Sequence, residues 1–131
     1  MNEGKKIIFV DYENVQRTGL EGLNYLNKND EIKIFFSRNS NIIRIDFLSE
    51  AQKANVSMDY ILVDKTGKNA LDFVLIYYLG REIERRKDTK EYINYIIISK
   101  DLDFQSIIYN INKDKNNYHI YQYERIEKMF Q

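Results

Sequence analysis

The 131-residue sequence contains no cysteine and no proline, and its single histidine is His119. Without cysteine the chain has no disulfide framework, no thiol nucleophile and no cysteine-ligated zinc site. A Ser-His-Asp triad would depend on His119, which lies in the stretch YHIYQY. We expect that stretch to be a strand and His119 to be a structural side chain rather than a catalytic base.

Long apolar runs and a net charge are also absent. No run approaches the roughly 18 apolar residues of a membrane span, and the start, MNEGKK, leads into a strand rather than a secretory signal. We therefore expect a cytoplasmic protein with no membrane contact. Basic and acidic residues both number 20, which argues against a nonspecific polyelectrolyte binder but allows a nucleic-acid enzyme with a local acidic site. The length suits one domain over residues 1–131.

Short apolar stretches alternate along the chain with stretches of helical periodicity. This alternation predicts an α/β fold with a parallel sheet and right-handed crossovers. We expect five strands in the order 3-2-1-4-5, which puts strands 1 and 4 side by side at the switch point. The expected strands are 5–11, 31–37, 56–63, 92–99 and 118–123, and the expected helices are 20–27, 42–54, 69–87, 104–113 and 124–131. Residues 12–15 are expected to be a loop.

Aspartates follow the strands that the predicted order makes neighbours. Asp11 ends the first strand, and Asp101 and Asp103 follow the apolar run Ile96–Ile98. Asp72 lies in the first turn of the longest helix, whose start must also lie at the carboxyl edge of the sheet. Ligands of open α/β sheets bind outside the carboxyl ends of the strands. We therefore expect the four aspartates to share one rim.

Each aspartate also has a structural interpretation. Asp11 suits a turn, Asp72 could form a capping pair with Asn69, and Asp103 could cap the helix that begins at Phe104. Taken together, however, carboxylates on one rim repel each other unless a cation lies among them. Hard divalent cations such as Mg²⁺ prefer oxygen ligands, and such an ion polarises a phosphodiester and activates water. We therefore predict a metal site of Asp11, Asp72, Asp101 and Asp103.

Other polar residues lie in connections at the same edge. Asn14 could hydrogen-bond an aspartate or a water molecule at the metal, and we count it with the catalytic residues. Arg38, Lys68, Asn69 and Lys100 are candidates for substrate binding because they could meet phosphates. For the cations, a solvated surface charge is an equally good interpretation.

Three motifs resemble those of NYN-type and bacterial members of the PIN-like nuclease superfamily. Asp11-Tyr12-Glu13-Asn14 resembles the D-x-E-N opening, and Ser99 to Phe104, SKDLDF, resembles the closing S-x-D-x-D-F. Gly67 to Phe73, GKNALDF, with Tyr78-Leu79-Gly80 after it, resembles the middle motif. The motifs occur in the family's order, and the resemblance covers nearly the whole chain.

The resemblance implies a three-layer α/β/α sandwich and a single PIN-like nuclease domain over residues 1–131. It implies an endonuclease dependent on Mg²⁺ or Mn²⁺ that hydrolyses phosphodiester bonds, usually of RNA, by metal-activated water at the four aspartates. Many relatives dimerise and some act in toxin–antitoxin or anti-phage systems, so a homodimer and a protein partner that supplies specificity or inhibition are candidate partners. Typical PIN toxins carry a glutamate where Asp72 stands, which leaves open whether one or two metal ions bind.

Two alternatives stay open. The first is a DNA or flap nuclease, because the acids contact the phosphate and not the 2′-hydroxyl. The second is a non-catalytic PIN-like module that binds nucleic acid or protein. A receiver domain fits less well, because it needs a lysine after strand 5 and the next lysine is Lys128.

Overall fold

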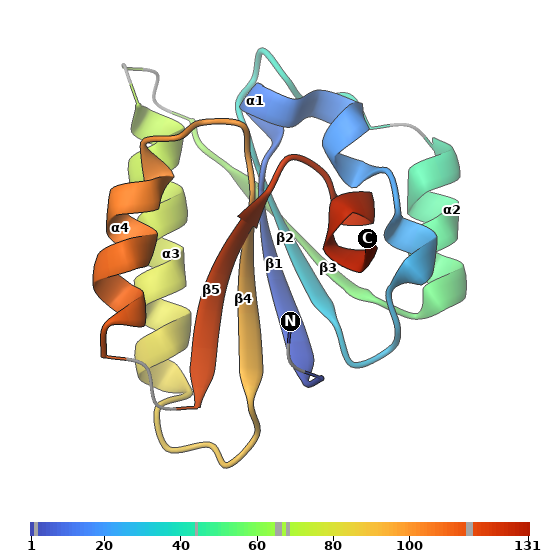
Figure 1. The fold of residues 1–131 in the computed structure, drawn as a ribbon. Helices are drawn as coiled ribbons and strands as arrows, with labels where there is room; N and C mark the ends of the chain where they lie inside the picture. Colours follow the sequence, from blue (N-terminus) through green and yellow to red (C-terminus); the bar gives the residue numbers. More distant parts are fainter. Residues whose placement is uncertain (2, 44, 65–66, 68, 115–116) are drawn as a thin grey trace.

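The fold is a twisted parallel sheet between two layers of helices. The computed structural model describes residues 1, 3–43, 45–64, 67, 69–114 and 117–131. The sheet has the order β3-β2-β1-β4-β5 with every neighbouring pair parallel (Figure 1), as the sequence predicted. Its strands are β1 (Lys5–Asp11), β2 (Glu31–Phe36), β3 (Ser57–Leu62), β4 (Ile93–Ile98) and β5 (Tyr118–Tyr123).

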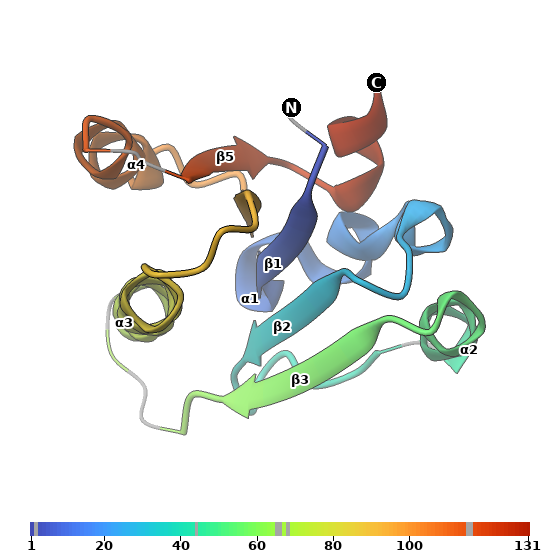
Figure 2. The ribbon, with the colours of Figure 1, turned by 90° about the horizontal axis from the view of Figure 1, so that it is seen from below.

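The protein has two hydrophobic cores, one on each face of the sheet, and the side chains of β1 alternate between them. Ile8 and Val10 face one layer and Ile7 and Phe9 the other, and all four are fully buried. Such two-sided burial is typical of a parallel sheet. Figure 2 shows α3 (Ala70–Arg85) and α4 (Phe104–Asn112) on one face, and α1 (Tyr12–Val15) and α2 (Ile45–Ala54) on the other. The short 3₁₀ helices η1 (Gln16–Leu20), η2 (Leu23–Tyr25) and η3 (Ile126–Phe130) complete the second layer.

The predicted strands and the three long helices are confirmed to within a few residues, but short segments differ. Residues 12–15 form one helical turn instead of a loop, and the predicted helix 20–27 is replaced by η1 and η2. Gly22 separates these two turns with φ of 103°, and a Cβ there would lie 2.5 Å from the Glu127 nitrogen. The chain therefore turns at Gly22 to let η3 pack closely. Within the described residues, no helix is long and apolar enough to cross a membrane.

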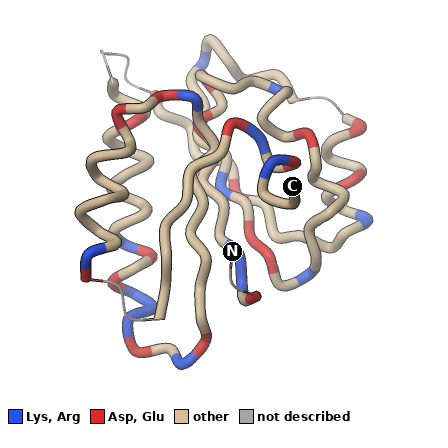
Figure 3. The backbone as a smooth tube through the Cα atoms, in the orientation of Figure 1, with Lys and Arg blue, Asp and Glu red and all other residues tan. Residues whose placement is uncertain are grey.

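The carboxyl edge of the sheet is where the chain connections bring distant acids together. Asp11 is the last residue of β1, and β4 ends at Ile98, directly before the segment that holds Asp101. The two strands are paired, with Val10 in register with Ile98. Figure 3 shows acidic positions gathered where α3 and α4 begin, beside the end of β1. This edge is the part of the fold that positions the site.

Candidate active site

Three of the four predicted aspartates line one hollow at the carboxyl edge. Asp11 comes from β1, Asp72 from the first turn of α3, and Asp101 from the segment after β4. The hollow has a volume of about 370 Å³. It is lined by Asp11, Glu13, Asn14, Gly67, Asn69, Ala70, Leu71, Asp72 and Asp101. Acids from three separate elements therefore surround one space.

Asp11 is the most buried acid of the site, with 3% of its surface exposed. The Ser99 hydroxyl donates a hydrogen bond of 2.9 Å to Asp11 Oδ2. Burial raises the pKa of Asp11, and hydrogen bonds from Ser99 and from the Asn14 backbone N–H partly offset that rise. The Asp101 N–H in turn donates to Ser99 Oγ at 3.1 Å. Ser99 thus links the end of β1 to the loop after β4.

Asp72 and Asp101 both line the hollow, and their side chains interact with each other. Burial, followed by the negative charges of Asp11 and Asp101, raises the pKa of Asp72 to about 6. A cation in this position would replace the proton and remove the repulsion that raises the pKa.

The donors of this site fit a hard divalent cation. Every side chain that could act as ligand offers a carboxylate or amide oxygen, which suits Mg²⁺ or Mn²⁺. Within the part of the chain that the structure describes, no three carboxylate or imidazole groups already converge as a metal site. Asp72 and Asp101 form the close pair, with Asp11 beside them, so side chains would turn toward a bound ion.

Asp103 lies apart from this hollow. It is exposed and lines a neighbouring hollow of about 210 Å³ between α3 and α4, which also touches Asp72 and Asp101. Its backbone N–H donates to Asp101 Oδ1 at 2.9 Å. Although Asp103 occupies the position before α4, its side chain makes no capping hydrogen bond to a described residue. Asp103 therefore belongs to the neighbouring hollow, which shares Asp72 and Asp101 with the acidic one.

Asn14 connects the two loops at the carboxyl edge. Its side-chain oxygen accepts a hydrogen bond of 2.7 Å from the Lys100 N–H, while its own N–H bonds to Asp11. The Asn14 side chain is exposed and lines the acidic hollow. It holds the segment after β4 against the turn after β1, which fixes the distance between Asp11 and Asp101.

The two predicted phosphate-binding cations that the structure describes, Arg38 and Lys100, do not line this hollow. Arg38 forms an exposed ion pair of 2.7 Å with Asp64 and lines neither hollow. Lys100 is exposed and also lines neither. Lys68 lies outside the described residues. Asn69 lines both hollows, so among the described candidates it is the one that touches the acidic site.

His119 stands in a structural environment, as predicted. Its ring centroid lies 4.6 Å from that of Tyr121, and its Nε2 lies 3.3 Å from the Asn112 amide nitrogen. The residue belongs to the first half of β5, so it is remote from the carboxyl edge.

The sequence analysis missed two residues that shape the site. Glu13 lines the acidic hollow, and its charge adds to the rise in the pKa of both Asp11 and Asp72. It stands within the D-x-E-N motif, which was the available signal. Gln122 of β5 donates to the carbonyl oxygens of Ser99 and Asp101 at 2.9 and 2.8 Å. Nothing in the alternating sequence of β5 marks that role.

The comparison with known families agrees with this geometry. The family model of the PIN domain matches residues 5–119, which cover strands β1 to β4, the start of β5 and the residues that line the acidic hollow. No curated protein and no solved structure matches the chain. Because the family match spans most of the sequence, the chain belongs to the PIN-like nuclease superfamily.

Proposed function

We propose that this protein is a divalent-metal-dependent endoribonuclease with its active site at Asp11, Asp72, Asp101 and Asp103. PIN domains are generally nucleases that use divalent metal ions. The observation that carries the proposal is the carboxyl pair of Asp72 and Asp101, which faces the buried Asp11 around one hollow. A phosphodiester cannot approach these acids unless a cation offsets their charge.

The residues of the site divide into those that hold the ion and those that position them. Asp11, Asp72 and Asp101 would hold Mg²⁺ or Mn²⁺, with Asp103 at the side toward α4. A bound ion supplies Lewis acidity toward the phosphate and lowers the pKa of water. Ser99 and Asn14 keep Asp11 at a fixed distance from the loop that carries Asp101, through their hydrogen bonds to both segments.

The choice of RNA over DNA rests on the family resemblance. The acids of the hollow interact with phosphate, which RNA and DNA share, so they do not discriminate between the two. Discrimination requires a contact with the 2′-hydroxyl. Asn69, at the junction of the two hollows, is the described amide that could make such a contact.

The test is cleavage of an RNA strand and a DNA strand of the same sequence in Mg²⁺ and in Mn²⁺. We expect the wild type to cut the RNA, and Asp101→Asn to reduce the rate at least about 100-fold because the ion loses a charged ligand. Asn retains an oxygen that can accept the Asp103 N–H bond, so the variant should stay folded. Asp88→Asn is the matched control, because Asp88 is exposed and follows the far end of α3.

Three results would contradict the proposal in different ways. An Asp101→Asn variant that is folded and fully active would exclude the acidic hollow as the active site. Equal cleavage of both strands would favour the alternative of a nuclease without RNA specificity. No cleavage by the wild type in either metal, together with nucleic-acid binding, would favour the non-catalytic module.

A further inference from the structure

The outer side of α3 carries two large aromatic side chains and an arginine in a row. Phe73 is 71% exposed and Tyr77 is 61% exposed, and Arg81 is also exposed. The three are spaced by four residues, so they share one side of the helix and follow one another at about 6 Å. The solvent side of a helix is normally polar. Two exposed aromatic rings in line therefore indicate a binding surface, which we name the α3 stripe.

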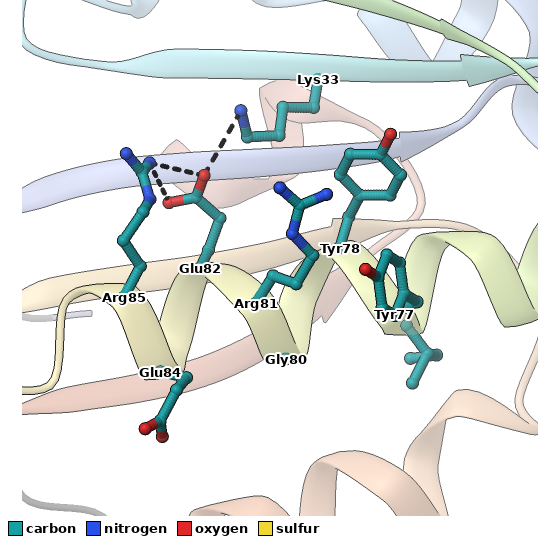
Figure 4. A pocket seen from close by; sticks show the side chains of 9 residues that line it. Lys33, Tyr77, Tyr78, Gly80, Arg81, Glu82, Glu84 and Arg85 are labelled. Atoms are coloured by element: carbon teal, nitrogen blue, oxygen red, sulfur yellow. Dashed lines mark hydrogen bonds and ion pairs between the residues drawn. The ribbon is translucent and has the colours of Figure 1, made fainter.

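The α3 stripe begins at the acidic site and is continuous with it. Phe73 directly follows Asp72 and lines the hollow between α3 and α4, together with Asp101 and Asp103. That hollow shares the lining residue Ile76 with a larger one of about 820 Å³ farther along α3. The larger hollow is lined by Lys33, Ile76, Tyr77, Tyr78, Gly80, Arg81, Glu82, Glu84 and Arg85 (Figure 4).

Arg81 is an exposed cation on this surface whose charge is available to a ligand. Its guanidinium lies 5.4 and 5.2 Å from the ring centroids of Tyr77 and Tyr78, which limits its movement. Tyr78 is anchored in turn, because its ring packs edge-on against the buried Phe35 at 5.4 Å. Figure 4 shows Arg81 beside the two tyrosines, whereas Glu84 points away from them. Arg81 forms no ion pair with any residue that the structure describes.

The neighbouring cations are already engaged with carboxylates. Arg85 donates to both oxygens of Glu82 at 2.7 Å. Lys33 lies 3.0 Å from Asp59 and 3.6 Å from Glu82. A phosphate entering the larger hollow would therefore be attracted first to Arg81, because its charge is exposed and has no acidic partner in the described part of the chain.

We propose that nucleic acid extending beyond the scissile bond crosses α3 as an unpaired strand along this stripe. Its bases would stack on Phe73 and Tyr77, and a phosphate would bind Arg81. This inference rests on the proposed nuclease function, and it adds a second binding surface outside the acidic hollow. Aromatic faces bind any unpaired base, whereas a duplex keeps its base faces stacked internally. An apolar protein partner would cover the rings but would leave the charge of Arg81 without an acceptor, so the strand is the better match.

The chain provides a matched control on α4. Tyr109 is 66% exposed, and Lys113 lies 4.9 Å from its ring centroid, also four residues on. Like Tyr77 with Arg81, the pair places an exposed cation beside an exposed tyrosine ring, but neither residue lines any of the three hollows described above. If binding depends on where these residues lie and not only on their type, substitutions in the α3 stripe should weaken it. Substitutions of Tyr109 and Lys113 should then have no effect.

The experiment measures fluorescence anisotropy of a labelled 12-nucleotide oligouridylate in EDTA, where cleavage does not occur. We expect the wild type to bind, and Phe73→Ala and Tyr77→Ala each to weaken binding by about 5- to 100-fold. Arg81→Gln should lower the slope of log Kd against log salt by about 0.7. Tyr109→Ala and Lys113→Gln should leave both quantities unchanged. Melting curves and sedimentation of each variant accompany the titration.

Several outcomes would overturn the inference. The first is that the wild type does not bind the oligouridylate. The second and third are that the stripe variants lose no affinity, or that the control variants lose as much. The last is that the wild type is a dimer which dissociates in Tyr77→Ala while binding persists. The last result would identify the α3 stripe as a protein interface. Because binding in EDTA needs no catalysis, a chain that binds through the stripe but never cuts would refute the proposed nuclease and leave the binding surface standing.

Discussion

The sequence allows two interpretations of Asp72, as a helix-capping residue or as an acid of the metal site. Its spacing from Asn69 is that of a helix-capping pair. In the structure Asn69 has a left-handed φ of 65°, and its side chain makes no capping bond to a described residue. The Asp72 carboxyl lines the acidic hollow, and the charge of Asp101 helps to raise its pKa. The acid therefore belongs to the site, and the sequence could not decide this because both interpretations require the same spacing.

The raised pKa of Asp72 predicts that Asp72→Asn stabilises the metal-free protein at neutral pH. The folded pKa of about 6 lies above the ordinary aspartate pKa of 3.8, so the proton-linked stability is full below pH 3.8 and is lost as the pH rises through 6. Asparagine resembles the protonated acid and avoids this loss. We expect the variant to melt about 3 °C higher than wild type at pH 7.5, a gain on the order of 1 kcal/mol after solvent screening.

The control for Asp72 is the same comparison at about pH 3, below 3.8, where the wild-type acid is mostly protonated in both the folded and the unfolded state. The difference between the two melting points should then be close to zero. A variant that is less stable than wild type by the same amount at both pH values would show that Asp72 supports the first turn of α3 instead of adding repulsion.

At the scale of the element, the sequence of α3 predicts the apolar positions of its buried face but not the buried acid on the same face. Leu71, Leu75 and Leu79 recur in the sequence at helical spacing, and all three are buried. The next position on that side is Glu82, which is also buried and is held by Arg85 and Arg86. A buried acid contradicts the apolar pattern, and its partners come from an ion network that sequence periodicity does not encode.

Glu82 joins α3 to the open side of the sheet. Burial alone would raise the pKa of Glu82, but hydrogen bonds from Arg85 and Arg86 and the charge of Lys33 bring it below its ordinary value. Lys33 is 8% exposed on β2 and also pairs with Asp59 of β3. Removing the charge of Glu82 would therefore leave a nearly buried lysine with one partner at the edge of the sheet.

We predict that Glu82→Gln lowers the melting temperature by about 10 °C, corresponding to about 3 kcal/mol for a broken buried ion pair. Glu84→Gln is the matched control, because Glu84 pairs with Lys87 in solvent at 2.8 Å. Its substitution should shift the midpoint by less than about 2 °C.

The penalty for Glu82→Gln should shrink as the pH falls through the lowered pKa of Glu82, since wild type then loses the same charge. Thermal melts from pH 7 to pH 3 measure both effects, and equal shifts for the two variants would contradict the network.

At the scale of the whole molecule, topology carries the acids to one place. Asp11 and Asp101 are far apart in the sequence, yet the strand order makes β1 and β4 neighbours. That order is a common arrangement of alternating strands and helices with right-handed crossovers, and it is the one that the sequence analysis expected. The support of the site depends on single side chains instead. Ser99 and Gln122 act through hydrogen bonds that a pattern of apolar residues does not encode.

The acidic hollow should make the stability of the whole molecule depend on metal. Mn²⁺ at about 100 times its dissociation constant should stabilise the wild type by about 2.7 kcal/mol, which is roughly 8–10 °C for a domain of this length. Metal-free Asp101→Asn should melt above wild type, because it removes one charge from beside Asp11 and Asp72, and it should respond less to Mn²⁺. Asp88→Asn should respond as wild type does.

Melting curves with and without the metal separate the cases without any substrate. If the wild type is unaffected by Mn²⁺ and Asp101→Asn is the less stable protein, the aspartates serve as turn and helix-end residues, and a PIN-like binding module becomes the better description.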